Sequence, residues 1–368
     1  MISNKNREYN LDLVKFIAII ATIAIHIFAQ GALTKTFSKT WYYFIFAGSF
    51  FRYCVPMFCI ASGYLLYTRD EIDSRKIFNK IIRFLFYFIV AEALYRFSDF
   101  LYIKYYYKNT YVFSEILGDL LNGNFRGHLY YIFIIIMIYL FAPIATQFVK
   151  NENKELRYLL LLWIFISLTL VFIINIFKIN TFKILKFYEL SGAYNYIFFA
   201  LLGAYFRKYK EKFLEKNIFI YLSFFIISLT MIIFSVIKMS GESTNFYVWD
   251  TNNILIFALS FNLFAILMKI NIKSDGFKKF LVAVSKNTFV IYLIHVFFVD
   301  FINIYGLSYT NFDGILKIFI PFIEIGIVFI FSLLISVILK LIKNKILNFW
   351  YFRSFFNCYF YVKIILIK

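Results

Sequence analysis

Apolar residues recur along the chain in blocks of about 20, without the alternation that is typical of a half-buried surface. Each block is long enough for a helix to cross a bilayer. Ten such blocks are at 11–31, 41–67, 81–99, 128–149, 157–177, 190–206, 217–237, 250–268, 287–303 and 316–340. The pattern predicts an all-α fold, a polytopic integral membrane helical bundle of about ten transmembrane helices. The first block is long and is not followed by a small-residue cleavage site, so we expect a retained span.

The positions of Lys and Arg between the blocks predict the orientation. With the N-terminus inside, most of the 39 Lys and Arg residues fall in the segments assigned to the cytoplasm, as the positive-inside rule requires. Both termini are therefore predicted to be cytoplasmic, in a multi-pass protein of the cell membrane. We expect a transmembrane domain at 1–343 and a basic, aromatic tail at 344–368 on the inner leaflet. The longest outer connection, at about 100–127, is predicted to form a short interfacial helix or to cover a cavity.

Composition excludes the other broad classes of protein. The 368 residues are 62% hydrophobic and 16% charged, with a mean hydropathy of +0.76, so a water-soluble fold could not bury the apolar surface. The net charge of +19 is dispersed among short loops, which argues against a nucleic-acid partner and leaves the lipid bilayer as the expected surroundings. Cys54, Cys59 and Cys358 are odd in number and lack metal-site spacing, so we interpret them as small apolar side chains and expect no metal.

The first block carries polar residues that are costly inside a membrane. Lys15 and His26 are 11 residues apart, which is about three helical turns, so both point from one face with about 16 Å between their levels. Asp12 precedes Lys15 by one turn. This polar line indicates a reaction path within the bundle. The alternative is that Asp12 pairs with Lys15 at the membrane edge while His26 bonds a carbonyl of a neighbouring helix.

Further polar groups lie in other blocks. Arg52 keeps its charge and needs a cavity, an acidic partner or a bound anion, unless it only snorkels to the interface. Pro56 predicts a kink, and Ser62, Gly63 and Tyr64 place a small residue where a helix or a ligand approaches closely. Glu92 and Arg96 are spaced for a simple ion pair.

All three histidines of the chain, His26, His128 and His295, occur in apolar runs. In the ninth block Thr288, Tyr292 and His295 share one helix face. Histidine is the side chain whose ordinary pKa lies closest to neutrality, which suits proton transfer.

Four of these segments together resemble the membrane-bound acyltransferase-3 family, in particular its surface-polysaccharide O-acetyltransferase branch. The resemblance covers nearly the full chain. The family's basic residue, ten intervening residues and a histidine match Lys15 and His26. Its "R-x-x-V-P-x-F-F-x-x-S-G-Y-L" matches Arg52 through Tyr64, its "H-L-W-Y" matches His128 to Tyr131, and its "Y-x-x-Y-L-x-H" matches the stretch ending in Tyr292 and His295. Two residues differ from the family pattern, because Lys15 replaces an arginine and Tyr130 a tryptophan.

The resemblance implies transfer of an acyl group, usually acetyl, from acyl-CoA (acetyl-CoA or another) to a sugar hydroxyl of a lipid-linked or surface glycan, with no tightly bound cofactor. His26, Arg52, Ser62, Tyr292 and His295 are the candidate catalytic residues. Asp12, Lys15, His128 and Tyr64 are the candidate substrate-binding residues. A basic cytoplasmic cluster is expected either to attract the phosphates of coenzyme A or to serve only as positive-inside charge: Arg75, Lys76, Lys80 and Arg83.

Two other classes of function remain open from the sequence. A transporter or flippase of glycan or lipid intermediates would use the same embedded charges to pass its substrate. A non-catalytic membrane scaffold would explain the apolar mass, but it would not explain the embedded His and Arg side chains. Formation of an acyl ester distinguishes the first function from both.

Overall fold

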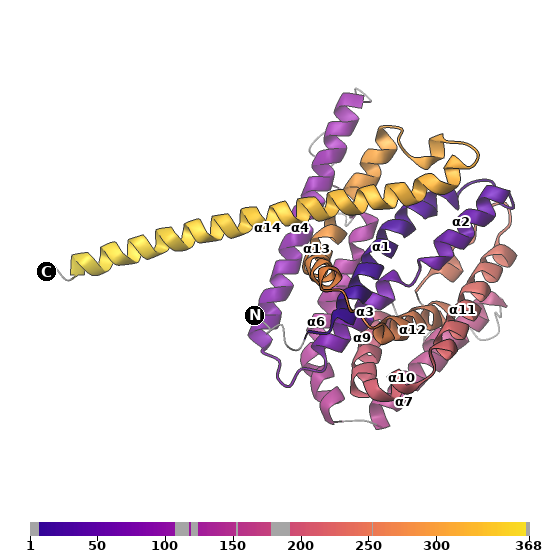
Figure 1. Ribbon diagram of the computed structural model, residues 1–368, viewed down its shortest axis with the longest axis horizontal. Helices are drawn as coiled ribbons and strands as arrows, with labels where there is room; N and C mark the ends of the chain where they lie inside the picture. The colour runs from indigo at the N-terminus through magenta and orange to yellow at the C-terminus, as the bar shows by residue number, and fades with distance from the viewer. Residues whose placement is uncertain are drawn as a thin grey trace.

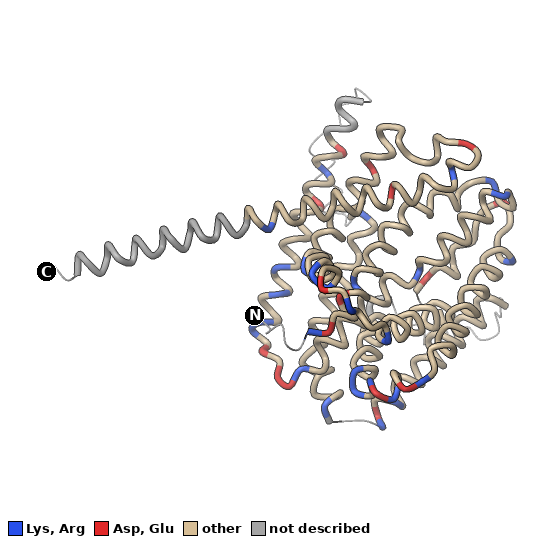
Figure 2. Tube along the Cα trace, in the orientation of Figure 1, with Lys and Arg blue, Asp and Glu red and all other residues tan. Residues whose placement is uncertain are grey.

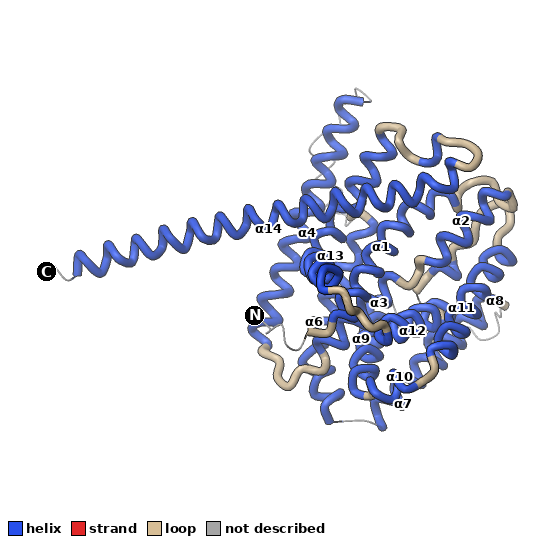
Figure 3. The backbone as a smooth tube through the Cα atoms, in the orientation of Figure 1, coloured by secondary structure: helices blue, strands red, loops and turns tan. Residues whose placement is uncertain are grey.

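The computed structural model describes residues 7–106, 118, 124–151, 154–177, 192–251 and 253–365, and the side chains of most of them. These residues form a bundle of helices joined by short loops, with no strand among them (Figures 1 and 3). The elements are α1 (Tyr9–Gly31), α2 (Lys39–Phe50), α3 (Cys54–Leu66), α4 (Ser74–Tyr106), η2 (Gly127–Leu129), α6 (Tyr130–Asn151), α7 (Lys154–Leu162), η3 (Trp163–Leu170), α8 (Val171–Ile176), α9 (Gly192–Lys208), α10 (Lys210–Glu215), α11 (Ile218–Met239), η5 (Tyr247–Trp249), α12 (Ile254–Lys269), α13 (Asp275–Ile304), η6 (Tyr309–Asn311) and α14 (Leu316–Ile365).

The structure confirms a polytopic helical membrane protein. Eight helical stretches of the described chain are long and apolar enough to cross a bilayer. The other two predicted spans coincide with α4, which is long but carries several charges, and with α9, which is 17 residues long. Lys and Arg gather mainly toward helix ends, and the middles of most helices are uncharged (Figure 2). The cytoplasmic location of the termini stays a prediction from the charge bias.

Several predicted boundaries are wrong. α13 begins at Asp275, 12 residues before the predicted span, because the Ser274 side chain accepts a hydrogen bond from the Phe277 amide and starts the helix there. α14 runs without a break to Ile365, so the backbone of the predicted tail continues the last span. Most of the connection at 100–127 lies outside the described residues, so its predicted interfacial helix is not tested.

The second predicted span is two helices rather than one kinked helix. α2 ends at Phe50 and α3 begins at Cys54, with Arg52 in the turn between them. Pro56 therefore lies in the first turn of α3, where its missing N–H removes no helical hydrogen bond. The break places Arg52 and two helix ends inside the bundle, which a continuous helix would not do.

α1 is the central helix of the bundle. It packs against α2, α3, α12, α13 and α14, and its apolar side chains are buried around most of its circumference, among them Val14, Ala18, Ile19 and Ala21. A helix that is apolar all round is typical of such a central position. The polar residues of α1 therefore face other helices rather than lipid.

α3 and α9 pack closely against each other, as the small residue Gly63 predicts. A Cβ atom at Gly63 would lie 1.8 Å from the carbonyl oxygen of Ala200, and one at Gly203 would lie 1.9 Å from that of Ile60. Both neighbours are backbone atoms, so a side chain could fit only if the helices separated. Small residues that allow backbones to approach are typical of membrane helix interfaces.

Gly63→Ala should destabilise the protein by at least about 1–3 kcal/mol, which is the usual cost of overpacking. The expected result is a lower midpoint of thermal unfolding in detergent and less protein in the membrane. Gly326→Ala is the matched control, because a Cβ at Gly326 in α14 meets nothing within 4 Å. Equal unfolding midpoints for the two variants would contradict the close contact of α3 with α9.

Candidate functional site

The three histidines, which are far apart in the sequence, meet inside the bundle. His26 comes from α1, His128 from η2 at the start of α6, and His295 from α13. Their ring centroids are 5.2 Å apart for His26 and His295, 5.6 Å for His128 and His295, and 6.1 Å for His26 and His128. We call these three side chains the histidine cluster. The predicted candidates from three separate spans therefore belong to one site.

The members of the histidine cluster differ in accessibility. His26 is partly exposed, His128 is 8% exposed and His295 is fully buried. The Nδ1 atom of His295 lies 2.7 Å from the carbonyl oxygen of Tyr292. Because a carbonyl only accepts, Nδ1 carries the proton and Nε2 keeps its lone pair. That Nε2 atom and the Nε2 atom of His128 have no hydrogen-bond partner in the described structure, so the cluster holds two buried ring nitrogens with unused hydrogen-bonding capacity.

Tyr292, a predicted catalytic residue, lies against the histidine cluster. Its ring centroid is 5.8 Å from that of His295, and its hydroxyl donates to the backbone carbonyl of His128. The hydroxyl thus fixes the backbone at His128. Ser62 is connected to Tyr292 through Tyr131. Ser62 lies beside the Tyr131 hydroxyl, and the Tyr131 ring centroid is 5.2 Å from that of Tyr292.

Arg52 lies near the cluster, because it lines one cavity with Ile25 and Tyr130, which are close to His26 and His128 in the sequence. The guanidinium carbon is 4.0 Å from the centroid of the Trp249 ring, which is a cation–π contact. The Nε atom is buried and has no partner among the described residues. Arg52 is therefore held in place by stacking and keeps a donor for a ligand.

The remaining predicted residues lie away from the histidines, toward the end of the bundle where α1 begins. The Lys15 Nζ atom is 3.5 Å from the Ser285 hydroxyl, and the Tyr64 hydroxyl donates to Glu8 at 2.7 Å. Lys15 is on the predicted face of α1, about three turns below His26. The structure thus separates the predicted set into a reaction centre and a second, distant group.

Asp12 does not pair with Lys15 as the alternative prediction supposed. It accepts two hydrogen bonds from Arg7, from Nε at 2.7 Å and from Nη2 at 2.8 Å. The hydrogen bond with Asp12 raises the pKa of Arg7. Because a bidentate guanidinium contact is geometrically better than a point-charge contact, Arg7 takes the carboxylate and leaves the ammonium of Lys15 to the space beside Ser285.

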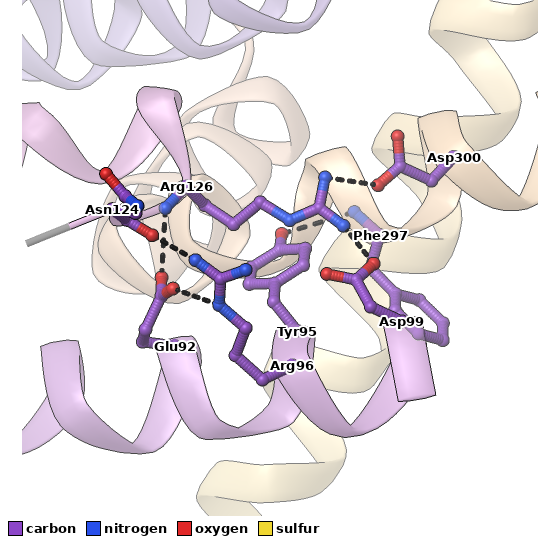
Figure 4. Close-up of polar contacts among 8 residues, drawn as sticks. All are labelled: Glu92, Tyr95, Arg96, Asp99, Asn124, Arg126, Phe297 and Asp300. Carbon is purple, nitrogen blue, oxygen red and sulfur yellow. Dashed lines mark hydrogen bonds and ion pairs between the residues drawn. The ribbon is translucent and has the colours of Figure 1, made fainter. Parts of the chain in front are cut away.

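Sequence reasoning missed a charged network beside His128, drawn in Figure 4. Arg126 bridges α4 and α13 through Asp99 and through Asp300 at 3.4 Å. Tyr95 lies between this network and the cluster: its ring centroid is 5.0 Å from that of His128, and its hydroxyl donates to the Leu293 carbonyl at 2.9 Å. Only the nearness of Arg126 to His128 in the sequence could have indicated it.

Glu92 ties this network to the backbone that leads into His128. The predicted ion pair with Arg96 is confirmed, at 3.0 Å, and Glu92 also accepts the backbone N–H of Arg126 at 3.1 Å (Figure 4). Arg126 is the residue that precedes η2. A carboxylate that is 1% exposed therefore anchors the start of the segment carrying His128.

The arrangement suits acid–base chemistry. Within the described ranges, no three His, Cys, Asp or Glu side chains are placed to hold a metal ion. The site instead combines imidazole rings that can be neutral, a guanidinium group held in place by stacking, and tyrosine hydroxyls. These groups can remove a proton from a hydroxyl and stabilise a developing oxyanion.

Comparison with known proteins agrees with this chemistry. No curated protein and no solved structure matches the chain. A family model described as an acyltransferase domain matches residues 8–341, a range that contains every helix of the site described above. The chain therefore belongs to the acyltransferase-3 family of membrane acyltransferases.

Proposed function

We propose that the protein is a membrane O-acyltransferase that moves a short acyl group, such as acetyl, from acyl-CoA to a hydroxyl of a cell-surface polysaccharide or lipid-linked sugar. The observation that carries the proposal is the meeting of His26, His128 and His295, with Arg52 beside them. Family membership supports acyl transfer in general. The histidine cluster supports a hydroxyl as the group that receives the acyl group.

The chemistry follows from the accessibility of His26. This ring, the partly exposed member of the cluster, takes the proton of the sugar hydroxyl. The hydroxyl oxygen then forms a bond to the thioester carbonyl carbon, and the carbon–sulfur bond breaks. The proton passes from His26 to the leaving thiolate, so the products are an acyl ester and free coenzyme A.

The surrounding groups stabilise this step. The Arg52 guanidinium, held in place over Trp249, has further N–H donors on its Nη atoms, which suit the oxyanion that develops on the thioester oxygen. The ring of the buried His295, held by the Tyr292 carbonyl, packs against His26 with centroids 5.2 Å apart and limits the movement of the reacting imidazole. Exclusion of water by the bundle protects the thioester from hydrolysis.

The donor is proposed to enter from the end of the bundle that carries Lys15. Lys80 of α4 lies near Lys15, and its Nζ atom contacts the Tyr139 hydroxyl at 2.5 Å. Lys15, Lys80 and Tyr139 come from α1, α4 and α6, and these helices also reach the histidine cluster. Two ammonium groups at this end suit the phosphates of coenzyme A.

The test is ester formation by the purified protein in liposomes. Radiolabelled acetyl-CoA and a lipid-linked sugar should give an alkali-labile acetyl ester on the sugar. Movement of the lipid-linked sugar across the membrane without any ester would refute the proposal and support the transporter alternative.

Lys15→Arg should leave acyl transfer within about tenfold of the wild type, because the positive charge that attracts the donor is kept. Lys15→Met removes the charge and should raise the KM for acetyl-CoA. The measurement is initial rate against acetyl-CoA concentration for both variants. Complete loss of activity in Lys15→Arg would show that the site needs the compact ammonium group itself.

A further inference from the structure

A cavity of about 210 Å³ lies at the break between α2 and α3. Ile25 and Tyr130 line it, and they neighbour His26 and His128 in the sequence. Arg52 forms another part of its wall. We call this space the Arg52 cavity. Its volume is below the roughly 300–1,000 Å³ of sites that enclose drug-sized ligands, so it suits a single ring and is too small for a nucleotide.

The far wall of the Arg52 cavity presents a row of hydroxyls that ends in a carboxylate. The hydroxyl of Tyr196 lies 2.5 Å from Oγ1 of Thr251, and Thr251 donates to the Asp250 carboxylate at 3.4 Å. The Tyr130 hydroxyl lies beside that of Tyr196. Each of these hydroxyls can both donate and accept a hydrogen bond, as the hydroxyls of a sugar can.

The near wall is aromatic and rigid. The Trp249 indole donates through Nε1 to the Ser49 hydroxyl at 2.9 Å. Gly48 leaves the space that the indole occupies, because a Cβ there would lie 2.7 Å from the ring. Flat aromatic rings beside hydroxyls suit a ligand with one apolar face and a polar edge, which is the character of a pyranose ring.

Arg52 supplies a second, independent sign of a ligand. Its Nε–H is buried in the cavity wall without an acceptor among the described residues. A charged donor left unpaired in a buried position is costly, whereas a ligand oxygen in the cavity would satisfy it. Ile25, which lines the same cavity, precedes His26 in α1, so a ligand held there is close to the reacting imidazole.

We propose that the Arg52 cavity binds one sugar ring of the acceptor, with Trp249 and Tyr196 against the ring and Thr251 and Asp250 bonded to its hydroxyls. Arg52 takes an oxygen of the same ring, which brings the reacting hydroxyl toward His26. This inference rests on the proposed function. The two substrates then enter from different places: the donor approaches from the Lys15 end, and the acceptor approaches from the loop that carries Asp250.

Tyr196→Phe and Thr251→Val test the proposal, since each removes one hydroxyl and keeps nearly the same shape. The probes are octyl glucoside, octyl galactoside and octyl N-acetylglucosaminide, with acetyl-CoA as donor. Each variant should raise the KM for the best glycoside about 3- to 10-fold, with the Kd for acetyl-CoA unchanged. Tyr305→Phe is the matched control, because that side chain is 64% exposed and lies outside the cavity.

The outcomes separate the inference from the proposed function. An unchanged glycoside KM in both variants, with ester still formed, would overturn the acceptor site and leave the acyltransferase intact. A parallel rise in the Kd for acetyl-CoA would also overturn it, because the cavity would then serve the donor or the fold. Absence of ester with every glycoside in the wild type would count against the proposed function itself.

Discussion

His26→Ala should lower the rate of acyl transfer by about 10²–10⁴-fold, the usual contribution of a general base. The reason is that His26 is the partly exposed ring of a cluster whose other two members are buried. His128 and His295 cannot replace it without moving toward the substrate. The measurement is kcat for acetyl ester formation by purified protein.

Two controls accompany this variant. The Kd for acetyl-CoA and the midpoint of thermal unfolding should stay close to those of the wild type, since residue His26 is not fully buried. Gln30→Ala, four residues along α1 and outside the cluster, should keep full activity. A His26→Ala protein that folds and transfers acetyl at more than about a tenth of the wild-type rate would contradict the assigned role.

Glu92→Ala should destabilise the protein by about 3–5 kcal/mol, the usual cost of removing one partner of a buried ion pair. The substitution leaves the Arg96 guanidinium without this carboxylate and also removes the acceptor for the Arg126 N–H. The expected result is a lower unfolding midpoint in detergent. Any protein that folds should have reduced kcat, because the segment that positions His128 loses its anchor.

Comparison with two other variants makes this prediction specific. Glu92→Gln keeps the shape and one acceptor oxygen, so it should be less harmful than Glu92→Ala. Glu242→Ala removes an exposed carboxylate in the loop before η5 and should be neutral. Similar unfolding midpoints for Glu92→Ala and Glu242→Ala would show that the contacts of Glu92 do not support the fold.

The sequence predicts those parts of the fold that depend on composition within one segment. Apolar blocks of about 20 residues locate the spans, because hydrocarbon thickness sets helix length. The close approach at Gly63 and the burial of Cys54 and Cys59 as free thiols are also confirmed. Each of these features follows from the type of residue at one position and from the lipid surroundings.

The sequence does not predict contacts whose partners are set by the arrangement of helices. The stacking of Arg52 on Trp249 joins residues nearly 200 positions apart, and no local sequence pattern predicts it. The same holds for Arg126 between Asp99 and Asp300. The break at Arg52 was missed because Phe50, Phe51 and Tyr53 keep the segment apolar across the turn.

The candidate site falls between these two cases. The rarity of histidine and its restriction to apolar runs indicated a shared role, and the cluster agrees with that indication. Helix-face reasoning also placed Lys15 and His26 correctly along α1. It could not show that Tyr64 bonds Glu8 at the far end of α3, because the packing partner of that face comes from another part of the chain.

The most direct test of a shared reaction centre is a cryo-EM structure of the protein with a thioether analogue of acetyl-CoA, which binds but cannot transfer its acyl group. The predicted result is an acyl end in contact with the His26 ring and near Arg52, with the phosphates toward Lys15. An acyl end bound on another face of the bundle, with the three imidazoles apart, would contradict the account.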